Sequence, residues 1–163
     1  GQDPKAVEAI TAEIKRHAAQ PVIMKLSPNV TDITEIARAA EAGGADALSM
    51  INTLTGMKID IHRQTFAIAN KTGGVSGPAV HPIAVRMVYQ TAQVVNIPII
   101  GMGGVQNAED AIEFLLAGAT AVAVGTANFH NPMTTVEVID GIADYMKAHQ
   151  VEKVTDLIGA VHG

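Results

Sequence analysis

Two stretches of the sequence indicate the fold most clearly: residues 97–104, Ile-Pro-Ile-Ile-Gly-Met-Gly-Gly, and residues 121–126, Ala-Val-Ala-Val-Gly-Thr. Each stretch is a short apolar run that opens into a glycine turn. This pattern predicts a buried parallel strand followed by a tight turn and a helix. Backbone N–H groups in such turns can point at a phosphate, because glycine has no Cβ to block its approach. Two such turns on successive strands are typical of the last two strands of a (β/α)₈ barrel.

The same unit of helix, glycine stop and strand recurs along the chain. Residues 42–50 resemble residues 117–125 in this respect. We therefore expect an α/β fold in which right-handed helical crossovers connect parallel strands. Apolar periodicity and capping residues predict helices over 4–18, 32–42, 82–92, 107–117 and 134–145, with a short terminal helix over 154–161. The four expected strands are residues 21–26, 46–51, 97–101 and 121–125.

Between residues 52 and 81 the helical periodicity disappears. Residues 57–61 and 66–69 are predicted to be two short strands on either side of a polar turn at 62–64. We interpret the segment near residues 54–78 as a hairpin excursion over the mouth of the barrel. Long insertions of this kind are usually functional.

The length of the chain limits how much of a barrel it can form. It has 163 residues, whereas a complete (β/α)₈ barrel needs about 200–250. It also begins with a helix that no strand precedes. We therefore expect residues 1–163 to form a single partial domain, the C-terminal half of a TIM barrel.

Composition excludes several classes of function. The net charge is −5 and no basic stripe is present, which argues against nucleic-acid binding. The longest apolar runs are too short to cross a membrane, and the polar amino end does not resemble a signal peptide. The absence of cysteine suits a cytoplasmic protein. The histidines show no metal-ligand spacing, so no metal site is expected; they are His17, His62, His81, His130, His149 and His162.

Ligands of parallel α/β sheets bind at the carboxyl ends of the strands. The expected strands end at Lys25, at Asn52-Thr53, and at the two glycine turns. Each residue also has a simpler interpretation. The role of the glycines could be limited to forming tight turns. Lys25 could extend into solvent or pair with a structural carboxylate, and Asn52 and Thr53 could cap a turn.

Five segments together resemble a known family. In order, they are Lys25-Leu26-Ser27-Pro28-Asn29, Met50-Ile51-Asn52-Thr53, Gly73-Gly74-Val75-Ser76-Gly77-Pro78, Ile99-Ile100-Gly101-Met102-Gly103-Gly104 and Val124-Gly125-Thr126-Ala127-Asn128-Phe129. In this order and spacing they resemble the C-terminal half of a class 1 dihydroorotate dehydrogenase, in particular the B subtype. The resemblance runs essentially from end to end.

The resemblance implies a barrel that holds FMN and oxidises dihydroorotate to orotate in pyrimidine biosynthesis. By position, Lys25 would lie beside the flavin ring and stabilise the negative charge of the reduced flavin. Asn52 would hydrogen-bond orotate, with Thr53 beside it. Ser76 and Gly77 would contact the flavin and its ribityl chain. The phosphate of FMN would be bound by Gly103, Gly104, Gly125 and Thr126.

The resemblance also implies partners and a missing group. B-subtype enzymes pair a homodimer of this subunit with an iron–sulfur and FAD subunit that passes electrons to NAD, which gives a heterotetramer. The A subtype shares much of this half and uses fumarate. The family's catalytic base is a cysteine in the N-terminal half, so no catalytic residue is expected in this chain, which alone should be inactive. Two alternatives remain: a non-catalytic half-barrel that binds a phosphate ligand, or part of another flavin- or phosphate-binding barrel enzyme.

Overall fold

A four-stranded parallel sheet forms the centre of the molecule. The computed structural model describes residues 1–161. The strands are hydrogen-bonded in the order β1, β2, β7, β8, and every pairing is parallel. This confirms the predicted α/β fold with four parallel strands. The strand bounds are β1 Ile23–Lys25, β2 Ala47–Met50, β7 Ile99–Met102 and β8 Ala121–Ala123.

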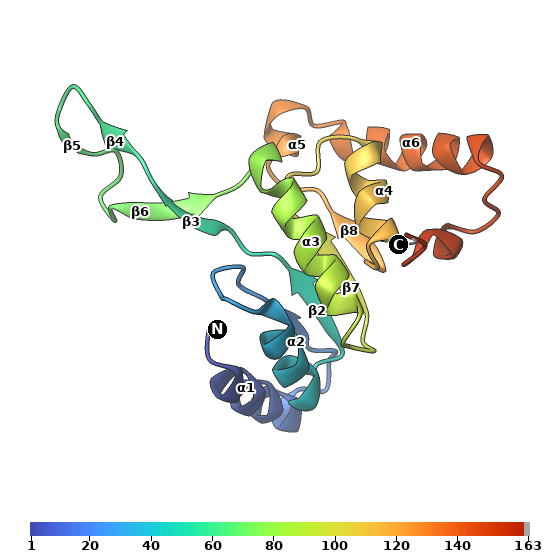
Figure 1. Cartoon of the computed structure of the whole chain (residues 1–163), viewed down its shortest axis with the longest axis horizontal. Coiled ribbons are helices and arrows are strands. Elements are labelled where there is room, and N and C mark those ends of the chain that lie inside the picture. The colour runs from blue at the N-terminus through green and yellow to red at the C-terminus, as the bar shows by residue number, and fades with distance from the viewer. Residues whose placement is uncertain (162–163) are drawn as a thin grey trace.

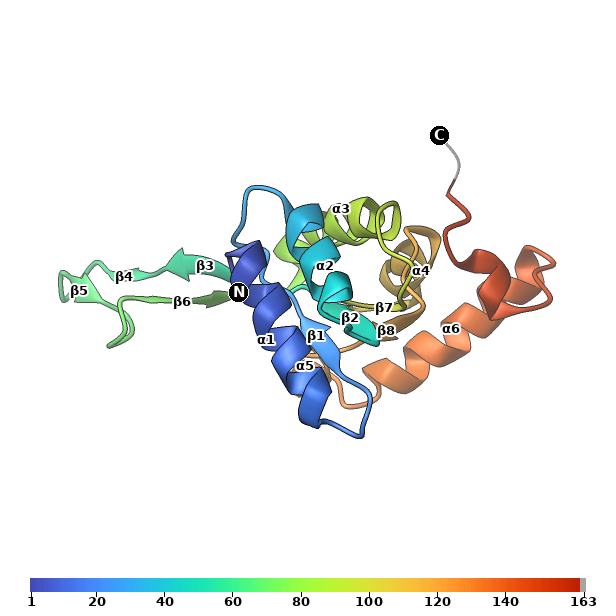
Figure 2. The ribbon, with the colours of Figure 1, turned by 90° about the horizontal axis from the view of Figure 1, so that it is seen from below.

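Helices connect the parallel strands and cover one face of the sheet. Helices α2, α3 and α4 lie side by side on this face (Figure 2), while α1 packs on α2 and α6 packs on α4. The predicted helices are thus confirmed to within a few residues, except that the terminal one is a short 3₁₀-helix. The bounds are α1 Pro4–His17, α2 Ile33–Ala42, α3 His81–Ala92, α4 Ala108–Leu116, α5 Ala127–His130 and α6 Thr134–Ala148, with 3₁₀-helices at Pro78–Val80 and Val154–Leu157.

Polar side chains fix where the crossover helices begin. The Asp32 carboxylate accepts a hydrogen bond from the Thr34 backbone N–H at 2.8 Å, which caps α2. The Asn107 side chain accepts from the Asp110 N–H at 3.0 Å, which caps α4. Each cap satisfies a backbone donor that the helix leaves free. These caps set where the chain turns from strand to helix above the sheet.

The two faces of the sheet differ in burial. Leu48, Met50 and Ile99 face the helices and are 0%, 0% and 2% exposed. On the opposite face Ile23 is 50% exposed, although it lies in a strand. Residues 121 and 125 are exposed and residues 122–124 are half-buried, so the prediction that residues 121–125 form a buried strand was wrong about burial. β8 and β1 are the edge strands of the sheet, and each contains exposed residues.

The hairpin between β2 and α3 is longer and more regular than predicted. An antiparallel ladder at the base of the arm pairs β3 (Leu54–Met57) with β6 (Thr72–Val75). A second ladder at its tip pairs β4 (Ile59–Asp60) with β5 (Thr65–Phe66) (Figure 1). The predicted strand over residues 66–69 was mostly wrong, because only Phe66 of that range is in a strand. Figures 1 and 2 show that this arm projects away from the helices and the parallel sheet instead of folding over them.

Asp46 makes the stability of the fold depend on pH. Its carboxylate accepts hydrogen bonds from Lys15 Nζ at 2.7 Å and from the Val22 N–H at 2.6 Å, and these two contacts lower the pKa of Asp46 below its ordinary value of 3.8. A depressed pKa in the folded state stabilises the protein above the unfolded value. That stabilisation disappears as the pH falls through the lowered pKa.

We therefore expect Asp46→Asn to lower the free energy of unfolding at pH 7, where the native carboxylate is ionised. The difference from the unsubstituted protein should shrink at a second, acidic pH that is low enough to protonate the native carboxylate. Urea unfolding of both proteins at the two pH values measures this. An equal difference at both values would contradict the assignment.

Candidate functional site

A cleft of about 460 Å³ lies where the parallel strands end. Residues from the ends of all four strands and from the base of the arm line it. The structure thus brings together every site residue singled out from the sequence. Those lining residues are Lys25, Asn52, Thr53, Ser76, Gly77, Gly103, Gly104, Gly125 and Thr126.

Lys25 gives the cleft its positive charge. No aspartate or glutamate is among the lining residues, and the only other ionisable side chain there is His130. None of the salt bridges among residues 1–161 involves Lys25, so the structural pairing considered above is absent from this part of the chain. β1 is an edge strand and the Lys25 side chain is exposed, as in the alternative that it extends into solvent. The cleft remains suited to an anionic ligand.

The first glycine turn has a backbone that only glycine adopts easily. Gly103 has φ 136° and Gly104 has φ 73°. A Cβ on Gly104 would lie 2.7 Å from the Gly77 carbonyl oxygen and 2.9 Å from His81 Cβ. These glycines are therefore required both by conformation and by close packing against the base of the arm.

The second turn is more open. Among the described residues, nothing lies within 4 Å of a Cβ built on Gly125. The following helix, α5, has only four residues, so its dipole adds little, and the open backbone at Gly125 is the feature that suits a ligand. The Thr126 hydroxyl lies 3.3 Å from the Ser76 hydroxyl. This hydrogen bond joins the turn to the base of the arm.

Asn29 holds the first residues of the arm, a role that was not predicted from the sequence. Its Nδ2 donates to the Thr53 carbonyl at 3.0 Å, and its Oδ1 accepts from the Thr55 N–H at 2.9 Å. The loop after β1 thereby holds the start of the arm, and with it Asn52 and Thr53. The only sequence signal for Asn29 was its place in the segment from Lys25 to Asn29, four residues after the end of β1.

We expect Asn29→Ala to accelerate hydrogen exchange at the Thr55 amide by about tenfold, because that N–H loses its side-chain acceptor. Asn29→Asp keeps an oxygen in the accepting position and should leave the exchange slow. Exchange measured by NMR or mass spectrometry tests this. Equal exchange in the alanine variant and the unsubstituted protein would show that Asn29 does not anchor the arm.

Two further findings concern metal binding and membrane helices in the described residues. Within residues 1–161, no cluster of three or more histidine and acidic side chains is arranged to bind a metal ion. His162, one of the histidines considered for ligand spacing, lies outside the described residues. No helix in the same part of the chain has both the length and the apolar character needed to cross a membrane.

Comparison with known proteins identifies the family. The sequence profile described as dihydroorotate dehydrogenase matches residues 1–146. The chain belongs to the dihydroorotate dehydrogenase family. The dihydroorotate dehydrogenase B (NAD(+)) catalytic subunit of Lachnoclostridium phytofermentans is 73% identical over 161 residues, covering 99% of this chain and 54% of that relative. The catalytic subunit of the same name from Alkaliphilus oremlandii is 60% identical over 159 residues, covering 98% and 53%.

The fold comparison agrees with the sequence comparison. A crystal structure of the dihydroorotate dehydrogenase of Eimeria tenella in complex with ferulenol superposes with a TM-score of 0.72 at 27% identity. The match covers 86% of this chain and 38% of that one. The chain spans about half the length of the curated dihydroorotate dehydrogenases it matches. The resemblance seen in the sequence is thereby confirmed for the family.

Proposed function

We propose that this chain is the C-terminal half of a B-type dihydroorotate dehydrogenase, an enzyme that uses FMN to oxidise dihydroorotate to orotate in pyrimidine biosynthesis. The observation that carries the proposal is the single cleft in which the nine site residues meet. Family membership supports the activity, and the names of the relatives support the B type.

The charge of the cleft and its glycine turns support FMN as the cofactor. It has a lysine and no carboxylate among its lining residues, which suits a phosphate ester. Gly103, Gly104 and Gly125 let a phosphate approach the backbone, and the Thr126 hydroxyl can donate a hydrogen bond to it. Ser76 and Gly77 would hold the ribityl side, and Lys25 the flavin ring. When bound, FMN supplies the acceptor for the hydride from C6 of dihydroorotate.

The side chains of the chain bind and orient the remaining components. The Asn52 amide would hydrogen-bond the pyrimidine, and Thr53 would contact substrate or cofactor beside it. Lys25 would offset negative charge that develops in the cleft during oxidation. The base that removes the C5 proton is not among these residues, because the chain has no cysteine. The chain by itself should therefore be inactive.

The proposal includes the setting of the enzyme. A homodimer of the complete catalytic subunit would pair with an iron–sulfur and FAD subunit, and electrons would pass through that subunit to NAD. The (NAD(+)) in the relatives' names supports this acceptor over fumarate. We place the assembly in the cytoplasm, where pyrimidine precursors are made.

The open face of the sheet favours a second candidate for the isolated chain, a non-catalytic half-barrel. Ile23 on that face is 50% exposed. An uncovered apolar face and two open sheet edges predict self-association or pairing with a complementary half. Mass spectrometry separates the cases: a mass near 16.9 kDa identifies a true fragment, and about twice that mass identifies a complete subunit.

Orotate formation by the complete protein tests the proposed function. We expect activity with NAD when the iron–sulfur partner is present and much less without it. Activity with fumarate alone would assign the A subtype instead. A yellow protein that forms no orotate with either acceptor would favour another flavin-dependent barrel enzyme.

A further inference from the structure

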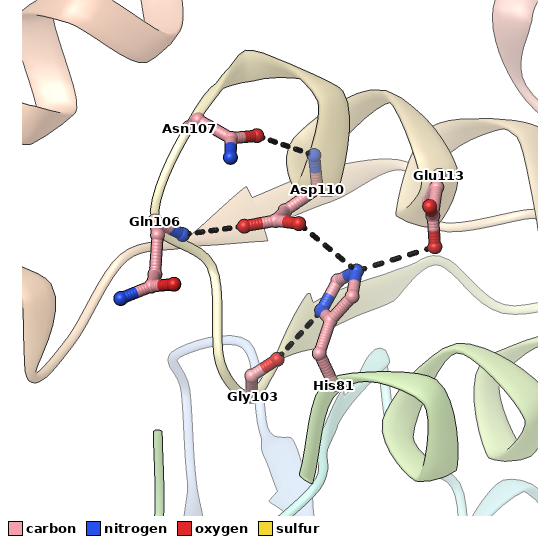
Figure 3. Close-up of polar contacts among 6 residues, drawn as sticks. All are labelled: His81, Gly103, Gln106, Asn107, Asp110 and Glu113. Atoms are coloured by element: carbon pink, nitrogen blue, oxygen red, sulfur yellow. Dashed lines mark hydrogen bonds and ion pairs between the residues drawn. The ribbon is translucent and has the colours of Figure 1, made fainter. Parts of the chain in front are cut away.

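His81 is a buried histidine that connects the first glycine turn to two helices without lining the cleft. It begins α3 and is 7% exposed. Its Nδ1 lies 2.9 Å from the Gly103 carbonyl oxygen (Figure 3). A carbonyl oxygen only accepts hydrogen bonds, so Nδ1 carries the proton and donates it. His81 therefore anchors the turn from the side opposite the cleft.

Contacts on the rest of the ring hold it in this orientation. The His81 ring packs against the Phe114 ring in a T-shaped arrangement, with 5.0 Å between the ring centroids. Nε2 lies 3.4 Å from a Glu113 carboxylate oxygen and 3.8 Å from one of Asp110. No hydrogen-bond partner for Nε2 is present among residues 1–161, so the contacts that fix the ring are the Phe114 packing and the Nδ1 hydrogen bond. The ring is thus held between α4 and the turn.

The same network reaches the other end of the turn. Asp110, beside His81, accepts a hydrogen bond from the Gln106 N–H at 2.8 Å (Figure 3). Gln106 lines the cleft, as Gly103 and Gly104 do. The backbone from residue 103 to residue 106 is therefore attached at both ends to side chains that lie behind it.

Peptide geometry converts this anchoring into a direction for a donor. In a planar trans peptide, the C=O of one residue and the N–H of the next point in opposite directions. The Gly103 carbonyl points to His81, which is outside the cleft, so the Gly104 N–H points the other way. This is the direction in which an anionic ligand would be bound.

We propose that His81 is a positioning residue for phosphate recognition: by holding the Gly103 carbonyl, it keeps the Gly104 N–H directed into the cleft and so selects a flavin that carries a phosphate over one that does not. The inference rests on the proposed function, since it takes FMN as the ligand. It adds a residue that touches neither cofactor nor substrate.

Comparing FMN with riboflavin, which has the same ring and ribityl chain but no phosphate, tests this role. In the complete protein, His81→Ala should weaken FMN binding by about tenfold and leave riboflavin binding unchanged. Quenching of flavin fluorescence measures both affinities. His81→Asn places an amide N–H near the position of Nδ1 and should restore most of the FMN affinity.

A matched control is His149→Ala. In the unsubstituted protein, His149 Nδ1 also lies 2.9 Å from a backbone carbonyl oxygen, that of Tyr145. His149 is, however, exposed at the end of α6 and does not line the cleft. Neither affinity should change in this variant. If His81→Ala fails to fold, His81→Phe keeps the ring against Phe114 without a donor and should show the same selective loss.

The outcomes separate the inference from the function beneath it. Equal losses of FMN and riboflavin affinity, or an asparagine variant no better than alanine, would overturn the role of His81 while leaving FMN as the cofactor. A complete, unsubstituted protein that binds neither flavin would overturn the proposed function, and the inference with it.

Discussion

Replacing Lys25 by alanine in the complete protein is expected to lower the rate of orotate formation by about 100-fold, the usual effect of removing a group that stabilises charge in the transition state. Lys25 is the only lysine or arginine among the residues that line the cleft, so no neighbour can take over its charge. FMN content should remain near normal, because the proposed phosphate contacts are made by the backbone turns and not by Lys25. Steady-state kinetics and the flavin-to-protein ratio measure the two effects separately.

The control for this substitution is Lys147→Ala, since Lys147 is an exposed lysine on α6 with 80% of its side chain accessible. It removes the same charge from the protein without touching the cleft and should leave turnover unchanged. Near-normal turnover in the Lys25→Ala protein would remove the role assigned to its ammonium group.

The second large effect is expected from Gly104→Ala. The φ of 73° costs a non-glycine residue about 1–2 kcal/mol, and the new Cβ would lie 2.7 Å from the backbone oxygen of Gly77. Because that neighbour is backbone, the turn must move to relieve the contact. We expect FMN affinity to fall by at least about tenfold and the flavin-free protein to lose about 1–3 kcal/mol of stability.

Gly125→Ala provides the matched comparison. Gly125 has no close neighbours among the described residues, and its φ is outside the left-handed region. Alanine there should leave the free energy of unfolding of the flavin-free protein unchanged and affect only FMN binding. If Gly104→Ala retained both stability and FMN affinity, the tight packing of the first turn would have no functional consequence.

Much of the parallel sheet could be predicted because its signals are local. Short apolar runs bounded by glycine and by helix caps such as Asp32 and Asn107 locate strands and helices within a few residues. Burial was predicted less well. An apolar strand such as β8 has the same sequence whether or not another strand lies beside it, so its exposure could not be read from its residues.

The ladder between β3 and β6 at the base of the arm was not predicted, for a different reason. Gly73 and Gly74 weaken any strand signal, yet both lie in β6. The structure explains them, since a Cβ on Gly74 would collide with the Thr53 side chain across the ladder. Such a close approach depends on the partner strand, which is about 20 residues away in sequence.

The cleft residues could be located from the sequence because parallel strands end at one edge of a sheet. Their supports could not. His81 and Gly103 are 22 residues apart, and Asn29 and Thr55 are 26 apart, so neither contact has a local signature. Residues that position a site through hydrogen bonds behind it become visible only in three dimensions.

Anaerobic addition of dihydroorotate to the purified complete protein, followed by visible absorption, tests the proposed function directly. We predict a flavin spectrum that bleaches as orotate appears, in a protein whose extracted cofactor is FMN. A colourless protein that does not take up FMN, or a bound flavin that stays oxidised with excess dihydroorotate, would contradict the assignment of the cleft.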